Sequence, residues 1–205
     1  MDSHEEARQT PVLVALVGPP AVGKMTVGQE MSRLTGWPLY FNHRLLDLLT
    51  DFFPWGSRGF NHAVRSFNDV FYEEAGASGL RLINTWGWRF DVQAESEAVV
   101  RYASPILAAG GEVFVAELTA LLDVRLERNR TENRQRHKKT DWATDEWLTE
   151  IHHANRWSSG GTLPVDLPHH VIDTTVRTAM DSAREIYRHF KLERFLVSIA
   201  FVPTA

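Results

Sequence analysis

The chain has 205 residues, of which 43% are apolar and 23% charged, and its formal net charge is -4. A chain of this length fits one α/β domain, or one domain with a small insertion. The weak negative charge argues against a general binder of nucleic acid or of membrane surfaces. The sequence contains no cysteine, which excludes disulfides and thiolate metal sites.

Apolar runs and helical spacings alternate along the chain. The first run, over residues 12–17, is continuous, as expected for a strand that is buried on both faces. In chain order, the expected strands are 12–17, 39–41, 80–85, 113–116 and 170–172, with helical patterns between and after them. This alternation predicts a parallel sheet with helices on both sides. The expected fold class is therefore α/β, a three-layer αβα sandwich around a five-stranded parallel sheet.

The domain boundaries follow from composition. We expect residues 1–10 to form a disordered tail and residues 11–194 to form a single domain. Residues 195–205 are expected to be a C-terminal extension. Its apolar stretch, Phe195 to Val202, is compatible with an edge strand, with docking on the core, or with a dimer contact. The N-terminus lacks the pattern of a signal peptide, and no apolar run approaches the about 20 residues of a membrane span. We therefore expect a soluble, cytoplasmic protein, either monomeric or homodimeric.

A glycine-rich turn follows the first strand and opens a helix, with the sequence Gly18-Pro19-Pro20-Ala21-Val22-Gly23-Lys24-Met25-Thr26. Glycines permit backbone conformations in which several N–H groups point at phosphate oxygens, beside the positive end of the following helix. Lys24 would add a mobile positive charge at the β- and γ-phosphates. The strict pattern has Ser or Thr directly after the lysine, whereas here Met25 precedes Thr26. We expect nucleotide binding through Gly18, Pro20, Ala21, Val22, Gly23, Lys24, Met25 and Thr26.

The ending of this loop resembles that of adenylate kinases, in which a glycine and then a threonine follow the lysine. The resemblance implies that Thr26 touches phosphate and that magnesium is held largely through water. Over residues 11–190 the order of elements is similar to the P-loop kinases of the nucleoside-monophosphate kinase and shikimate kinase superfamily. That similarity implies ATP and Mg²⁺ as cofactors, an acceptor-binding helical region at about 43–78, and an arginine-rich lid at about 125–142.

The predicted lid is rich in positive charge. Fixed guanidinium groups stabilise the charge that spreads over oxygens during phosphoryl transfer. By resemblance, Arg125 is assigned to the nucleotide, and Arg128 and Arg134 to catalysis. Acidic residues interleave with these bases, a pattern that is also typical of a solvated, salt-bridged helix. The basic residues of the segment are Arg125, Arg128, Arg130, Arg134, Arg136, His137, Lys138 and Lys139.

The acceptor side is predicted to begin after the second strand, at Asn42-His43-Arg44. Related kinases often place an aspartate here, which this chain lacks. Asn42 could position water or ligand, and His43 could accept a proton from an acceptor hydroxyl, because histidine titrates near neutral pH. Alternatively, these residues cap the following helix. Asp47, one turn later, is a second candidate base.

The end of the third strand, Trp86-Gly87-Trp88-Arg89, is a further candidate for acceptor binding. Nucleoside-monophosphate kinases carry an Asp-Gly-Phe-Pro-Arg run at this edge, and by resemblance Arg89 would grip an acceptor phosphate. Ligands of open α/β sheets bind beyond the carboxyl ends of the strands. We therefore expect Trp86 and Trp88 to line an acceptor pocket, with Phe52, Phe53 and Trp55 as further candidates for its wall.

Two acids close later strands. Glu117 follows an apolar run, as a Walker B acid does, and is the first candidate to help hold hydrated magnesium together with Thr26. Asp173 is expected near the nucleotide base, where it would support a turn or cap the final helix.

Taken together, these features predict an ATP-dependent phosphotransferase that moves the γ-phosphoryl group to a hydroxyl or phosphate of a small molecule. Three alternatives remain open. A nucleoside-monophosphate kinase would use Arg89 on its acceptor phosphate. An antibiotic-modifying or biosynthetic kinase would use an aromatic pocket. A nucleotide switch or regulatory ATPase would act through a protein partner.

Overall fold

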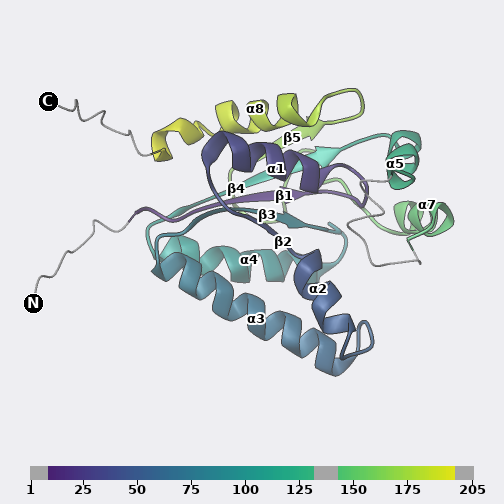
Figure 1. Ribbon diagram of the computed structural model, residues 1–205, viewed down its shortest axis with the longest axis horizontal. Helices are drawn as coiled ribbons and strands as arrows, with labels where there is room; N and C mark the ends of the chain where they lie inside the picture. Colours follow the sequence, from purple (N-terminus) through teal and green to yellow (C-terminus); the bar gives the residue numbers. More distant parts are fainter. Residues whose placement is uncertain (1–8, 132–142, 197–205) are drawn as a thin grey trace, which may run out of the picture.

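The structure is a computed structural model that describes residues 9–131 and 143–196 (Figure 1). Its five strands are β1 (Val12–Val17), β2 (Leu39–Phe41), β3 (Arg81–Trp86), β4 (Glu112–Thr119) and β5 (His169–Asp173). Its helices are α1 (Lys24–Thr35), α2 (His43–Thr50), α3 (Arg58–Ala77), α4 (Gln93–Ala108), α5 (Leu122–Asn129), α7 (Asp145–Ala154), α8 (Ala179–His189) and the 3₁₀ helix η1 (Leu192–Phe195). The strands form one parallel sheet in the order β2-β3-β1-β4-β5. The predicted α/β fold class is confirmed.

Helices cover both faces of this sheet. The pair α1 and α8 lies on one face, and α3 and α4 lie on the other (Figure 1). β1 is the central strand, and all six of its side chains are buried. Because side chains alternate along a strand, Val14 and Leu16 pack towards α1 and α8, whereas Leu13 and Ala15 pack towards α3 and α4. The continuous apolar run of β1 thus supplies both layers of the core.

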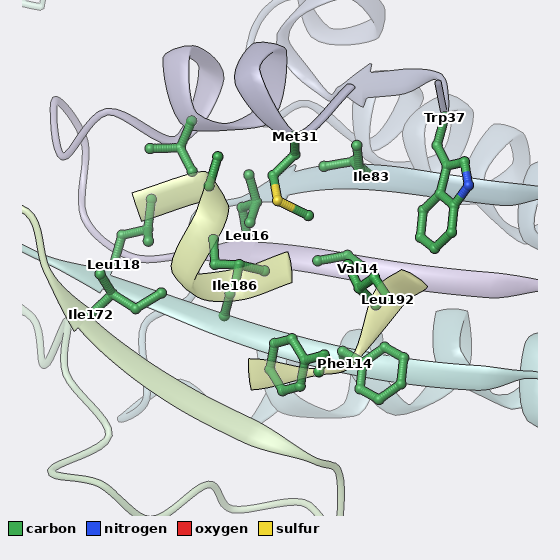
Figure 2. Close-up of a cluster of buried hydrophobic side chains, with 14 of the residues drawn as sticks. Val14, Leu16, Met31, Trp37, Ile83, Phe114, Leu118, Ile172, Ile186 and Leu192 are labelled. Carbon is green, nitrogen blue, oxygen red and sulfur yellow. The ribbon is translucent and has the colours of Figure 1, made fainter. Parts of the chain in front are cut away.

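Figure 2 shows the core layer beneath α1 and α8. Met31 from α1 and Ile186 from α8 meet Leu16 of β1, and all three side chains are completely buried. Full burial of such a side chain contributes about 1.5–3 kcal/mol. Phe195 of η1 joins the same cluster and meets the Trp37 ring edge to face, with the ring centroids 6.3 Å apart. Phe195 therefore packs in the core, whereas the sequence places it in the C-terminal extension. The remainder of that extension, from residue 197, lies outside the described residues.

Several element boundaries differ from the sequence-based expectation. β4 continues past Glu117 to Thr119, because its last residues pair with β5 as far as Asp173. α3, for which the glycines Gly76 and Gly79 predict the end, includes Gly76, where a Cβ would lie 2.5 Å from the carbonyl oxygen of Pro105 on α4. Of the predicted tail, residues 1–8 lie outside the described part. Thr10 lies against β3, and its carbonyl accepts a hydrogen bond of 3.2 Å from Arg81 Nε.

The carboxyl ends of the strands lie at the end of the sheet near α2, α5 and α7 (Figure 1). The glycine-rich turn after β1 belongs to this end, as do the loops after β3 and β4. Within the described residues, no helix combines the length and the apolar character needed to cross a membrane.

Candidate functional site

The turn between β1 and α1 is held in an unusual backbone conformation. Gly18 has φ 134° and Gly23 has φ 101°, and Ala21 also has a positive φ of 63°. A Cβ on Gly18 would lie 2.2 Å from the carbonyl oxygen of Leu118 on β4, so no larger residue fits there. α1 begins directly after Gly23, at Lys24. The turn is therefore curled over the N-terminus of a helix, a geometry that favours anions.

The side chain of Lys24 lies over this turn. Its ammonium donates hydrogen bonds to the carbonyl oxygens of Gly18 at 2.6 Å and Pro19 at 2.7 Å. The predicted phosphate-binding lysine and the predicted glycine turn are therefore in contact. Thr26 lies half-buried in the first turn of α1. Its predicted contact with phosphate and magnesium stays a prediction.

Arg125 of α5 supports the turn from behind and is only 1% exposed. Its Nε donates to the carbonyl oxygen of Pro20 at 2.9 Å, and its Nη1 lies 3.1 Å from Nδ1 of His152 on α7. Burial, then the charge of Arg125, then His153 lower the pKa of His152, so the neutral ring can accept this hydrogen bond. Arg125 was expected at the nucleotide. It connects α7 to the turn between β1 and α1, residues 18–24, which we call the phosphate turn after its predicted role.

Arg128, one turn further along α5, connects the same turn to the end of β5. Its guanidinium donates to the carbonyl oxygen of Val22 at 3.2 Å and to that of Thr174 at 2.5 Å. The Thr174 hydroxyl also donates to the Val22 carbonyl, at 3.0 Å. Asp173 accepts a hydrogen bond of 2.8 Å from the Thr175 N–H. Of the two roles predicted for Asp173, this contact fits support of the turn after β5. Arg134 lies outside the described residues.

A cavity of about 580 Å³ joins the phosphate turn to the predicted acceptor side. Residues of the turn and of α1 form one side of it. The ends of β2 and β3, α2, α7 and the segment after α7 form the other. Its described lining consists of Pro20, Ala21, Val22, Lys24, Met25, Phe41, Asn42, His43, Leu46, Trp55, Thr85, Gly87, Arg89, Glu95, Trp147, Ile151, Asn155 and Trp157. One space thus brings together the predicted donor residues and the predicted acceptor residues Asn42, His43 and Arg89.

The residues that follow β2 divide between the cavity and the surface. Asn42 lies at the N-cap position of α2, but its side chain makes no capping hydrogen bond. Its Oδ1 is buried, and no described residue donates to it. His43 also lines the cavity. Arg44, expected to bind substrate, is exposed outside that lining, and its guanidinium lies 4.4 Å from the centre of the Phe41 ring.

The aromatic walls differ from those predicted. Trp88 is completely buried, its indole N–H donates to Ser96 Oγ at 3.1 Å, and its ring stacks on Phe90. Trp86 is only 8% exposed and packs against Tyr72. The prediction that Trp86 and Trp88 line the pocket is therefore wrong, because both rings fill the core beneath it. The walls come from Trp55, which the sequence did suggest, and from Trp147 and Trp157.

Arg89 is paired with Glu95 in the first turn of α4. Its Nε donates to Glu95 Oε1 at 2.7 Å, and a terminal guanidinium nitrogen donates to the same oxygen. The backbone N–H of Arg89 donates to the other oxygen, Oε2, at 2.6 Å. Both carboxylate oxygens therefore hold Arg89 in place. Glu95 was not among the predicted site residues, although an acid in the first turn of a helix can reach back to the preceding loop.

Glu117, expected to help hold hydrated magnesium, is surrounded by hydrogen-bond donors of the protein. Its side chain is completely buried. Oε1 accepts from the Ser158 hydroxyl at 2.9 Å and the Ser159 N–H at 3.0 Å, and Oε2 lies 3.0 Å from His169 Nε2. Both oxygens are therefore engaged in holding the chain after α7 against β4 and β5. Across the ranges 9–131 and 143–196, no three His, Asp or Glu side chains come together as metal ligands.

The segment after α7 is the part of the site that sequence reasoning missed. Arg156 pairs with the loop after β3, where its N–H donates to Asp91 at 3.0 Å and its carbonyl accepts from the Phe90 N–H at 2.8 Å. With Glu117 on its other side, the segment holds Trp157 at the cavity. A tryptophan directly before Ser158-Ser159-Gly160-Gly161 was the available signal, because aromatic side chains are common in the walls of ligand pockets.

No family model matches the chain, and no curated protein matches it in sequence. Solved structures do match. A candidate kinase from Chloroflexus aurantiacus superposes with a TM-score of 0.63 at 22% identity, over 88% of this chain and 99% of that one. The shikimate kinase of Acinetobacter baumannii, solved with shikimate, gives 0.53 at 19% identity, over 91% and 96%. The Mycobacterium tuberculosis APS kinase, solved with AMPPNP and APS, gives 0.54 at 16% identity, over 89% and 99%. The chain therefore has the fold of the P-loop kinases that include shikimate kinase and APS kinase.

Proposed function

We propose that this protein is an ATP-dependent phosphotransferase that moves the γ-phosphoryl group of ATP to a hydroxyl group of a small molecule. One observation carries the proposal: a single cavity is lined on one side by the phosphate turn and on the other by Asn42, His43 and aromatic side chains. A donor and an acceptor bound there would lie in one space, which phosphoryl transfer requires. The fold that the chain has in common with shikimate kinase and APS kinase supports the same reading.

The residues present suit the phosphates of a nucleotide. The positive φ angles of Gly18, Ala21 and Gly23 curl the backbone so that its N–H groups can face an anion at the start of α1. Lys24 lies on that turn and would exchange its carbonyl contacts for phosphate oxygens. Magnesium bound with ATP would neutralise phosphate charge, and the Thr26 hydroxyl, a hard oxygen ligand, is the group proposed to help hold it, partly through water.

On the acceptor side, His43 is the proposed base. It opens α2 and lines the cavity, and an imidazole can accept a hydroxyl proton near neutral pH. Asn42 precedes it and would orient the acceptor. Arg125 and Arg128 hold the phosphate turn and the turn after β5 in their relative positions. We propose that they act mainly by keeping this donor site in shape.

The test is incubation of the purified protein with ATP, Mg²⁺ and a panel of sugars, nucleosides, nucleoside monophosphates and natural-product alcohols, with mass spectrometric detection of new phosphoesters. Lys24→Ala should reduce transfer by about 10²–10³-fold, because a preorganised charge at the transferring group is lost. Arg33→Ala is the matched control, since Arg33 lies on the same helix with its side chain 66% exposed. If the wild-type protein does not bind ATP in calorimetry, the proposal is wrong.

A further inference from the structure

The positive charge that the described residues place on the acceptor side of the cavity is paired with an acid. Of the described lining residues, Lys24 and Arg89 carry a permanent positive charge, and Lys24 belongs to the phosphate turn. Both oxygens of Glu95 hold Arg89. Oε1 accepts hydrogen bonds from the guanidinium, including one of 2.7 Å from Nε, and Oε2 accepts one of 2.6 Å from the backbone N–H. Such multiple charge-assisted hydrogen bonds are strong and geometrically specific. An acceptor carboxylate or phosphate near Arg89 would also meet the negative charge of Glu95.

Aromatic and aliphatic side chains supply much of the remaining wall of the acceptor side, beside the polar residues Thr85 and Asn155. Trp55, Trp147 and Trp157 line it together with Phe41 and Ile151. The indole N–H of Trp157 donates to the Ile151 carbonyl at 2.8 Å, so that polar group is already paired within the protein. The ring of Trp55 rests on Phe60, with the centroids 4.9 Å apart. These rings offer contact area to an apolar body.

One polar atom on this side lacks a partner among the described residues. Oδ1 of Asn42 is buried, and none of them donates a hydrogen bond to it. A buried acceptor of this kind is costly unless a donor satisfies it. A carbonyl oxygen can receive a hydrogen bond from a hydroxyl group, whereas a carboxylate or phosphate dianion has no proton to offer. The unpaired oxygen therefore also favours an acceptor that carries O–H groups.

Resting on the proposed function, we propose that the acceptor is an alcohol with a flat apolar body and no anionic group, and that Glu95 selects against anionic acceptors by occupying Arg89. In the transfer, the acceptor hydroxyl oxygen forms a bond to the γ-phosphorus while the bond from that phosphorus to the β–γ bridging oxygen breaks. ADP leaves with that electron pair, and the hydroxyl proton passes to His43. This assignment sets the chain apart from a nucleoside-monophosphate kinase, whose acceptor carries a phosphate.

The proposal is tested with two probes of the same shape, naphthalene-methanol and its counterpart that carries an additional ring carboxylate. Binding of each is measured by calorimetry with ADP and Mg²⁺ present. The uncharged alcohol should bind the wild-type protein about tenfold or more tightly than the carboxylate, the ratio expected for one uncompensated charge contact. Equal or tighter binding of the carboxylate, or no binding of the alcohol, would overturn the proposal.

The role of Glu95 is tested with Glu95→Gln. The matched control is Glu97→Gln on the same helix, where Glu97 is exposed and bonds to Gln93. Glu95→Gln should narrow the preference for the alcohol about tenfold, because Arg89 is then available to a carboxylate, and Glu97→Gln should leave the ratio unchanged. An unchanged ratio in Glu95→Gln would contradict the selective role. Calorimetric ATP binding by the same samples separates the two hypotheses, since loss of ATP binding refutes the kinase, whereas retained ATP binding with the wrong probe preference refutes only the acceptor class.

Discussion

Glu117 on β4 and His169 on β5 face each other at 3.0 Å between the carboxylate oxygen Oε2 and the imidazole Nε2. The carboxylate is completely buried, and its other oxygen accepts from Ser158 and Ser159. Two neighbouring strands and the chain after α7 are therefore joined at one acid. Through Ser158 and Ser159, Glu117 contacts the chain next to Trp157, which lines the cavity, although Glu117 itself is absent from the described lining.

Replacing Glu117 with Gln should lower the free energy of unfolding by about 2–3 kcal/mol, because a buried hydrogen-bond acceptor is lost and its donors remain. Burial raises the pKa of Glu117, but hydrogen bonds from His169, Ser159 and Ser158 outweigh it, so the net shift is downward. A lowered pKa stabilises the fold above the ordinary glutamate pKa and loses that contribution as pH falls through the folded value. Chemical denaturation at pH 7 and pH 4 checks both points. Glu112→Gln, in an exposed ion pair on the same strand, should change stability by less than about 1 kcal/mol, and an equal effect would count against the prediction.

The contact between Arg125 and His152 should make stability depend on pH near neutrality. The pKa of His152 is lowered, so the unfolded chain binds its proton more readily, and stability falls as pH drops below the ordinary histidine value of 6.5. His170 and His189 also have lowered pKa values and act in the same window, so the difference between variants is the measure. His152→Gln should lose less stability than the wild type between pH 7.5 and pH 5.5. His62→Gln, at an exposed position of α3, should follow the wild type.

Removal of the Arg128 side chain should weaken nucleotide binding about tenfold, because the phosphate turn loses a support. This corresponds to a loss of about 1.4 kcal/mol in the free energy of binding. The change removes hydrogen bonds to the carbonyl oxygens of Val22 and Thr174. Calorimetry with ATP on Arg128→Ala measures the effect. Arg130→Ala is the control, because the Arg130 side chain is 70% exposed and pairs with Asp145 instead. Equal ATP affinities for the two variants would refute the supporting role.

Alanine at Gly76 should destabilise the fold by about 2 kcal/mol or more, in the range of overpacked core positions. Helix propensity alone would favour alanine by about 1 kcal/mol. The sign of the change in the free energy of unfolding therefore shows which effect is larger. The new Cβ would lie 2.5 Å from the carbonyl oxygen of Pro105, and that backbone atom cannot move without shifting α4. Gly87→Ala, whose Cβ would have its nearest neighbour at 3.8 Å, should be tolerated. Thermal unfolding distinguishes the two, and a stabilised Gly76→Ala would show that the helices can separate freely.

The sequence predicted the sheet and the phosphate turn because both depend on local signals. The apolar run of β1 and the glycines before Lys24 specify their own conformations wherever the remaining chain lies. The acceptor walls depend on contacts between distant segments. The spacing of apolar residues does not indicate which tryptophan is buried in the core and which lines the cavity. The indole N–H of the buried Trp88 is paired with Ser96 of α4, whereas Trp157 lines the cavity beside a loop that bonds to Glu117.

The partners of Glu117 are likewise distant in the sequence. An acid after an apolar run at the end of a strand looks the same in sequence whether it faces a metal or a loop. Its partners, Ser158 and His169, lie 41 and 52 residues further along the chain, and only the pairing of β4 with β5 brings them close. Arg125 is similar, because its contact with Pro20 spans 105 residues.

The anchoring of the segment after α7 has a consequence for the history of such a chain. The segment is held by the backbone N–H groups of Arg156 and Ser159 and by the Ser158 hydroxyl, with Asp91 and Glu117 as side-chain acceptors. The ring at position 157 contributes one hydrogen bond of its own, to Ile151. A substitution at position 157 would therefore change the wall of the cavity while leaving these anchoring contacts and the turn between β1 and α1 in place. If the proposed function holds, a duplicated copy of the gene would need few substitutions at this wall to take a different acceptor.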